Sequence, residues 1–151
     1  MFVKQIQVGH MAVFAYLVGD PITKDALVID PADDGKTILG AAATNGLRIN
    51  YIVNTHGHVD HIGGNAEMKR LTGAKIIVHA DDAVMLTSTP PAMLRMFGAT
   101  ASPPPDILVQ DGQLMSQSFF IHHFGLRQNH TRCSVKIVVW QCVIKFVFSS
   151  F

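Results

Sequence analysis

Short apolar runs, separated by turn residues, recur along the first two thirds of the chain. The run from Met11 to Val18 is followed by Gly-Asp-Pro, and the run from Asp25 to Asp30 is followed directly by a proline. Arg48 to Asn54 is rich in β-branched and aromatic residues, and Ala74 to His79 is apolar again. Runs of this length, bounded by Gly, Pro or Asp, predict four β-strands.

Helix signals alternate with these runs. A helix is predicted over about 33–45, where Asp33 or Asp34 can cap the first turn and Gly46 can end the last. A second helix is predicted over 65–72, and two shorter helices over 81–88 and 91–97. Strands that alternate with helices indicate an α/β domain in which helices pack on a sheet.

The composition narrows the class of protein. A chain of 151 residues is expected to form one domain, and 48% hydrophobic with 15% charged residues exclude a disordered or coiled-coil chain. Glu67 is the one glutamate among 11 acidic residues, which argues against a helical bundle. The formal net charge of +1 gives no general attraction to nucleic acid or anionic lipid, so neither is expected as a partner.

Signals for export or membrane insertion are weak. The first residues contain no long apolar segment, and the apolar stretch from Val135 to Phe148 is interrupted by two lysines and a glutamine. Cys133 and Cys142 are the only cysteines, which is too few for a disulfide scaffold. We therefore expect a cytoplasmic protein with no membrane partner.

The composition changes sharply after about residue 118. From Phe119 onward the chain holds 7 of its 12 aromatic residues and both cysteines, but no acidic residue and no proline. Two interpretations stay open. The segment 118–151 is either an ordinary series of core strands or a divergent tail produced by truncation or a frame shift.

The most informative segment is Thr55 to Gly64, with the sequence T-H-G-H-V-D-H-I-G-G, between a predicted strand and a predicted helix. His56 and His58 are two residues apart, so an extended backbone lets both imidazoles reach one metal ion. Asp60 and His61 are adjacent, so their side chains are expected to diverge and to suit a second ion. Gly57 is expected to give the backbone the freedom to bring the ligands together, and Gly63 and Gly64 are expected to let the chain turn tightly into the helix. The motif predicts a metal site.

This motif resembles the signature of the metallo-β-lactamase-fold hydrolases, in particular the glyoxalase II-like (hydroxyacylglutathione hydrolase-like) branch. Phe14 to Asp20 (F-A-Y-L-V-G-D), Leu27 to Asp33 (L-V-I-D-P-A-D) and Ile76 to Asp82 (I-I-V-H-A-D-D) fit the same family. The resemblance covers residues 1–117. It implies one metallo-β-lactamase-like domain over 1–151, an αββα sandwich of the α/β (α+β) class whose C-terminal half is incomplete.

The resemblance also implies roles for the motif residues. His56 and His58 match ligands of a first metal ion, and Asp60 and His61 match ligands of a second. Asp30 matches an aspartate that orients a ligand histidine through its other ring nitrogen. The alternative interpretation is that Asp30 is an ordinary turn residue before Pro31.

The third ligand of the first ion is expected in the tail. The family completes that site with a histidine in a G-H-T-x-G-S segment, and Asn129 to Ser134 (N-H-T-R-C-S) is the best match, which makes His130 the candidate. The match lacks both glycines. His122 and His123 compete for the same role, and His79 is interpreted as structural.

The implied function is metal-dependent hydrolysis of a small-molecule thioester. Two divalent ions, zinc first and iron or manganese as alternatives, would supply a metal-bound hydroxide, and Asp60 would act in catalysis by orienting it. The tail has no counterpart of the family's bridging aspartate or of its final ligand histidine. The second metal site is therefore expected to be incomplete, and hydrolysis by this chain is expected to be slow. Other readings are a non-catalytic metal-binding remnant, a sulfur dioxygenase or a nuclease of the same fold. An incomplete sandwich also predicts self-association through an exposed sheet.

Overall fold

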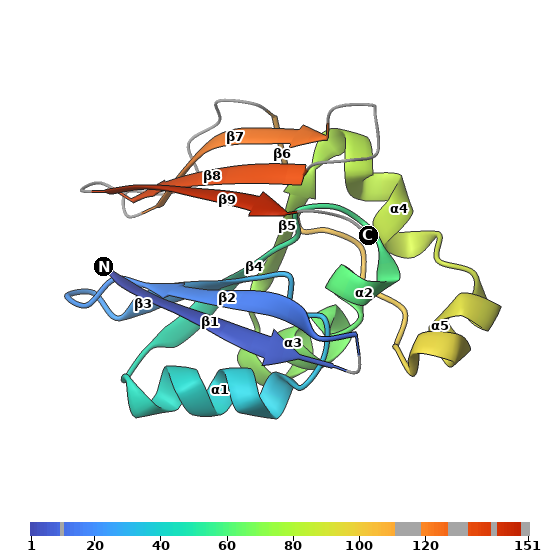
Figure 1. The fold of residues 1–151 in the computed structure, drawn as a ribbon, viewed down its shortest axis with the longest axis horizontal. Helices are drawn as coiled ribbons and strands as arrows, with labels where there is room; N and C mark the ends of the chain where they lie inside the picture. The colour runs from blue at the N-terminus through green and yellow to red at the C-terminus, as the bar shows by residue number, and fades with distance from the viewer. Residues whose placement is uncertain (10, 111–118, 127–132, 140–141, 149–151) are drawn as a thin grey trace.

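The computed structural model describes residues 1–9, 11–110, 119–126, 133–139 and 142–148, and from residue 119 onward it describes the strands alone. Figure 1 shows three layers: a lower layer with α1 and α3, a central sheet, and a second sheet above it. The elements, in chain order, are β1 (Phe2–Val8), β2 (Val13–Gly19), β3 (Asp25–Ile29), α1 (Gly35–Thr44), β4 (Arg48–Val53), α2 (Val59–Ile62), α3 (Asn65–Thr72), β5 (Lys75–His79), the 3-10 helix η1 (Ala80–Asp82), α4 (Ala83–Thr87), α5 (Pro91–Phe97), β6 (Ile107–Val109), β7 (Phe119–Leu126), β8 (Cys133–Val139) and β9 (Cys142–Phe148).

The central sheet has six strands in the order β1-β2-β3-β4-β5-β6. The pairs β1–β2 and β2–β3 are antiparallel, while β3–β4, β4–β5 and β5–β6 are parallel. The sheet is therefore mixed, and the expected α/β class is confirmed. Because parallel strands place their carboxyl ends at one edge, the residues that follow β3, β4 and β5 lie close together.

The second sheet is antiparallel, in the order β7-β8-β9. It faces the side of the central sheet that α1 and α3 leave open (Figure 1). The layers thus follow the order helix, sheet, sheet of the expected sandwich. No helix in the part of the chain that the structure describes is long and apolar enough to cross a membrane.

The core lies on the faces of the central sheet and under the two helices. Its largest fully buried side chains are Leu17, Leu27, Ile29, Ile38, Ile52, Ile62, Met68, Ile76, Ile77 and Leu86. Each such side chain stabilises the fold by about 1.5–3 kcal/mol through apolar burial. Strand β3 is buried from Ala26 to Ile29, as expected for a strand covered on both faces.

The predicted helices agree best with the structure where the sequence contains a clear helix-capping residue. Helix α3 occupies 65–72 as predicted and ends at Gly73 with φ of 71°. The Asp34 side chain accepts a hydrogen bond from the backbone N–H of Thr37 at the start of α1. Strand β1 was not predicted, because its apolar residues alternate with Lys4, Gln5 and Gln7 instead of forming a run, and Ile6 and Val8 alone are buried on it.

Candidate metal centre

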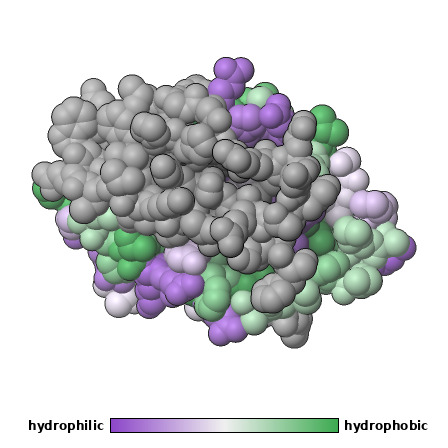
Figure 2. Space-filling view, turned by 45° about the horizontal axis from the view of Figure 1, so that its top comes forward, coloured by the Kyte–Doolittle hydropathy of each residue, from purple (hydrophilic) through white to green (hydrophobic). Residues whose placement is uncertain are grey.

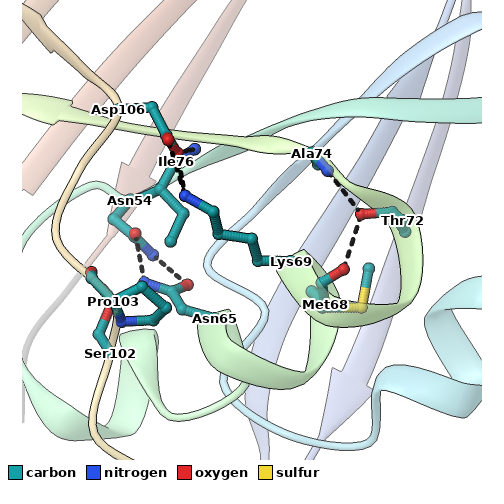
Figure 3. A network of polar contacts seen from close by, with 10 residues as sticks. All are labelled: Asn54, Asn65, Met68, Lys69, Thr72, Ala74, Ile76, Ser102, Pro103 and Asp106. Atoms are coloured by element: carbon teal, nitrogen blue, oxygen red, sulfur yellow. Dashed lines mark hydrogen bonds and ion pairs between the residues drawn. The ribbon is translucent and has the colours of Figure 1, made fainter.

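The ends of the motif loop are joined by a pair of asparagines. Asn54 directly precedes the loop, Asn65 directly follows it, and both side chains are fully buried. Each amide donates to the other's Oδ1, at 3.2 and 2.8 Å, and Asn65 Nδ2 also donates to Ser102 Oγ at 2.9 Å (Figure 3). The pair closes residues 55–64 into a ring at the end of β4.

A second polar contact fixes α3, the helix that leaves the loop. Lys69 Nζ donates to both carboxylate oxygens of Asp106, at 2.7 and 2.6 Å (Figure 3). The same carboxylate accepts the backbone N–H of Ile76 at 2.7 Å, so α3 is tied to strand β5. The helix therefore cannot slide along the sheet without breaking these bonds.

The motif glycines are required for the close approach of neighbouring backbone and side chains and not for an unusual backbone conformation. Gly63 and Gly64 have φ of −57° and −88°, which any residue adopts. A Cβ on Gly64 would overlap the Pro31 carbonyl oxygen, and one on Gly63 would lie 2.7 Å from the Ala32 oxygen. A Cβ on Gly57 would lie 2.6 Å from Met85 Cβ.

Asp30 holds the loop from the neighbouring strand. It follows β3, is fully buried and has a φ of 47°, a left-handed conformation that aspartate tolerates. Its carboxylate accepts the backbone N–H of Thr55 at 2.8 Å and the Thr55 hydroxyl at 2.6 Å. His61 Nδ1 lies 3.0 Å from the same carboxylate, the contact expected of an aspartate that orients a histidine.

The hydrogen bonds define the tautomer of His56. Since the Thr55 hydroxyl donates to Asp30, it accepts at 2.9 Å from His56 Nδ1, which must carry the proton. His56 Nε2 is then an unprotonated nitrogen that is buried and has no hydrogen-bond partner among the described residues. Burial, helped by the charges of His61 and His58 and opposed by Asp30 and Asp60, lowers the pKa of His56 to about 4. The ring is therefore neutral at pH 7.

Asp60 and His61 lie on the short helix α2. The expectation that their side chains diverge is wrong, since His61 Nε2 is 3.5 Å from Asp60 Oδ2. Burial lowers the pKa of His61, but the charge and hydrogen bond of Asp30 and the charge of Asp60 outweigh it, so the net change is upward. His61 is thus held between two carboxylates.

The three motif histidines meet at one place. The ring centroids of His56 and His58 are 4.6 Å apart with planes at 89°, and those of His56 and His61 are 4.2 Å apart. Within residues 1–110 without residue 10, no three His, Cys, Asp or Glu side chains are grouped so that they enclose an ion. The candidate third ligand, His130, lies outside the described residues, and His122 and His123 are described only as positions in β7.

The donors present nevertheless fit a divalent metal. Neutral imidazole nitrogens and a carboxylate are ligands that zinc, iron and manganese accept. An unpartnered buried acceptor such as His56 Nε2 costs about 1–3 kcal/mol, which a bound cation would recover. Asp30 already fixes the outer nitrogen of His61, as ligand histidines require.

A hollow of about 930 Å³ lies beside Asp60. It is bounded by the turn between β1 and β2, by the loop after β3, by α2 and α3, and by α5. Its apolar lining includes Val8, Met11, Val13, Val59, Met96 and Phe97, and its charged lining consists of Asp33, Asp60, Glu67, Arg70 and Arg95. Figure 2 shows hydrophobic side chains gathered over the end of the molecule that α5 forms.

Sequence reasoning missed Asn54 and Asn65 as residues of this site. Both flank the motif symmetrically, and this position is the one signal that could have marked them.

Comparison with known proteins identifies the family. The sequence profile of the Metallo-beta-lactamase superfamily matches residues 8–148, so the chain belongs to this superfamily. A hydroxyacylglutathione hydrolase of Polaromonas sp. (strain JS666 / ATCC BAA-500) is 46% identical over 80 residues. That match covers 52% of this chain and 30% of the relative, less than a third of its length. Other relatives of the same name, at 38–46% identity, confirm the resemblance to the glyoxalase II-like branch.

Solved structures agree on the fold. TTHA1623 in a di-iron-bound form superposes with a TM-score of 0.73 at 24% identity, covering 92% of this chain and 68% of that one. ETHE1 from Myxococcus xanthus gives a TM-score of 0.62 at 20% identity, covering 92% and 54%. At these identities the likeness shows the metallo-β-lactamase fold alone.

Proposed function

We propose that this chain is a metal-dependent hydrolase that cleaves a small-molecule thioester in the manner of glyoxalase II. The observation that carries the proposal is His56 Nε2, a neutral, buried and unpartnered nitrogen beside two further histidines and Asp60. The partial match to hydroxyacylglutathione hydrolases supports the thioester class.

In this proposal His56 and His58 hold one ion, with His130 as third ligand, and Asp60 and His61 hold a second. Zinc is the first candidate, and iron or manganese would suit the same donors. When bound, such ions lower the pKa of water and polarise a carbonyl group. Asp30 fixes the ring of His61, and Asp60 orients the nucleophile.

The hollow beside Asp60 is the proposed substrate site. Met11, Met96 and Phe97 offer apolar contacts to the body of an acyl group. Within the described part of the chain, neither Arg70 nor Arg95 forms an ion pair with a carboxylate, so both are available for an anionic substrate group. A cytoplasmic location and the absence of a nucleic-acid partner stay predictions.

The test is metal content together with thioester turnover. The purified chain is loaded with zinc, manganese or iron, and hydrolysis of S-lactoylglutathione is followed before and after chelation. We expect two metal equivalents and turnover that stops with chelation and returns with metal. His58→Ala should lower both, while Asp81→Ala, which changes a carboxylate whose side chain is 87% exposed, serves as control. Turnover that resists chelation would overturn the proposal, and bound metal without turnover would favour the non-catalytic remnant.

A further inference from the structure

Asn65 is the first residue of α3, and its fully buried side chain contacts two segments that are far apart in the sequence. Its Nδ2 donates to Asn54 Oδ1 at 2.8 Å and to Ser102 Oγ at 2.9 Å, and its Oδ1 accepts from Asn54 Nδ2 at 3.2 Å (Figure 3). The Ser102 hydroxyl donates its one hydrogen to the Pro103 carbonyl oxygen at 3.0 Å, so towards Asn65 it can only accept. This fixes the orientation of the Asn65 amide, whose two hydrogens are both used.

Ser102 is the point at which a long surface segment enters the interior. Among residues 87–108, all of which the structure describes, Ser102 is the single buried residue, at 8% exposure. Helix α5 belongs to this segment, has no buried residue of its own and ends at Gly98 with φ of 62°. Because α5 is held so weakly by its own side chains, its position depends on the bond between Ser102 and Asn65 that follows it in the chain.

The same segment forms one side of the hollow beside Asp60. Residues 95–97 of α5 line the hollow from this side, and Asp60 lines it from the motif loop, whose ends Asn65 helps to join. A Cβ on Gly63 would lie 3.2 Å from Ala99 Cβ, so the loop and the segment are in close contact just after the helix. The shape of the hollow between the loop and α5 therefore depends on how Asn65 holds both.

We propose that Asn65 is a positioning residue that holds the motif loop, through Asn54, and the α5 wall of the hollow, through Ser102, in one arrangement. The inference rests on the proposed function in taking the motif loop as the metal site and the hollow as the substrate site. The two bonds have separable effects. Loss of the bond to Asn54 loosens the loop and weakens metal binding, whereas loss of the bond to Ser102 frees α5 and weakens substrate binding. A general loss of stability would not separate the two.

The experiment compares the wild type with Asn54→Ala, Ser102→Ala, Asn65→Ala and the control Ser88→Ala. Ser88 is the matched control for Ser102, because it is an exposed serine in the same segment. Three quantities are measured for each protein. They are the affinity for Co²⁺ in competition with a chromogenic chelator, the KM and kcat for S-lactoylglutathione, and the rate at which trypsin cleaves after Arg95.

Trypsin reports on α5 because Arg95 is the single lysine or arginine between Lys75 and Arg127. Cleavage inside a helix requires that the helix opens, so the rate follows the population of the opened segment. Cleavage after Lys36, which lies on α1, measures opening elsewhere in the same molecule. Mass spectrometry of the fragments distinguishes the two cleavage sites.

We expect Ser102→Ala to raise both the KM and the rate of cleavage after Arg95 about fivefold, the change that corresponds to one lost hydrogen bond. Its Co²⁺ affinity, its kcat and its cleavage after Lys36 should stay at wild-type values, since the bond between Asn54 and Asn65 remains. Ser88→Ala should match the wild type in every measurement.

Asn54→Ala should show the opposite pattern. Its Co²⁺ affinity should fall about fivefold, while cleavage after Arg95 stays at the wild-type rate. Asn65→Ala should combine the effects of the two single losses. If Asn65→Ala does not fold, Asn54→Ala and Ser102→Ala carry the expectation.

Two results would overturn the inference alone. One is wild-type cleavage after Arg95 in Ser102→Ala. The other is an equal change of Co²⁺ affinity and of cleavage in Asn54→Ala and Ser102→Ala, which would make the role of both bonds merely structural. A wild type that binds Co²⁺ but hydrolyses no thioester would overturn the proposed function, while Co²⁺ affinity and cleavage would still decide the inference. A wild type that binds no Co²⁺ would overturn both.

Discussion

Asp30 concentrates three hydrogen bonds on one buried carboxylate, and this makes it the most sensitive residue of the centre. In Asp30→Asn, the amide nitrogen would face a donor from Thr55 or His61. A buried unsatisfied group costs about 1–3 kcal/mol, so the free energy of unfolding should fall by that amount, as measured by urea denaturation. Asp81→Asn, on an exposed carboxylate, should change it by less than about 0.5 kcal/mol. Equal stability of the two variants would contradict the role assigned to Asp30.

A second prediction compares two glycine-to-alanine substitutions, one in the motif loop and one on α1, which should change the stability of the protein in opposite directions. Gly64→Ala places a Cβ against the Pro31 carbonyl oxygen, so it should destabilise the protein by about 1–3 kcal/mol. Gly40→Ala lies on α1 with no atom within 4 Å of the new Cβ, and it should stabilise by about 0.5–1 kcal/mol. Thermal unfolding of both variants checks the signs. A neutral Gly64→Ala would show that the loop is less tightly packed than described.

The ion pair between Lys69 and Asp106 stabilises the position of helix α3, and its contribution depends on pH. Burial raises the pKa of Asp106, but hydrogen bonds from Lys69 and Ile76 and the charges of Lys69 and Lys75 outweigh it, so the net change is downward. A carboxyl whose pKa is lowered by folding stabilises the protein above its unfolded pKa of 3.8. This contribution is lost as the pH falls through the lower folded value.

Asp106→Asn should therefore lower stability by about 1 kcal/mol at pH 7. The difference from wild type should shrink as the pH falls below 3.8, since the wild-type carboxyl then loses its charge too. Urea denaturation at several pH values measures this, and Asp34→Asn, which changes a carboxyl at the cap of α1, is a suitable comparison. A difference that stays constant with pH would show that the charge of Asp106 is unimportant.

How far the sequence predicted these elements depended on the kind of signal. Continuous apolar runs and the Asp34 and Gly73 caps were sufficient to locate β2 to β5, α1 and α3. The alternating strand β1 was missed because its outer face is polar. The sequence does not predict α2, because four residues contain too few positions to show a helical period.

The sequence predicted only the part of the candidate site whose residues lie close together in the chain. His56, His58, Asp60 and His61 lie within six positions, so their proximity follows from the motif itself. The Thr55–Asp30 bond joins residues 25 positions apart. That contact depends on the pairing of β3 with β4, which residue spacing does not contain.

For the whole molecule, the proposed metal site predicts that folding and metal binding are coupled. A ligand that binds only the folded state stabilises it by about 2.7 kcal/mol at 100 times its dissociation constant. Added zinc should raise the unfolding temperature of the wild type, and a chelator should reverse the change. His56→Ala should remove most of this response, because it deletes the unpartnered nitrogen. An unfolding temperature that zinc leaves unchanged would contradict a metal site. Self-association through the sheet stays a prediction, which sedimentation at several concentrations would test.

The contacts described for His56 and His61 have a consequence for the order of events during synthesis. Asp30, Thr55, Asn65 and Ser102 all precede strands β7 to β9 in the chain. N-terminal parts of a chain begin to fold while the ribosome is still adding residues, at about 5–20 per second. The ring of residues 55–64 can therefore close on Asp30 before the last three strands emerge. Changes in those strands should then leave the histidine cluster assembled.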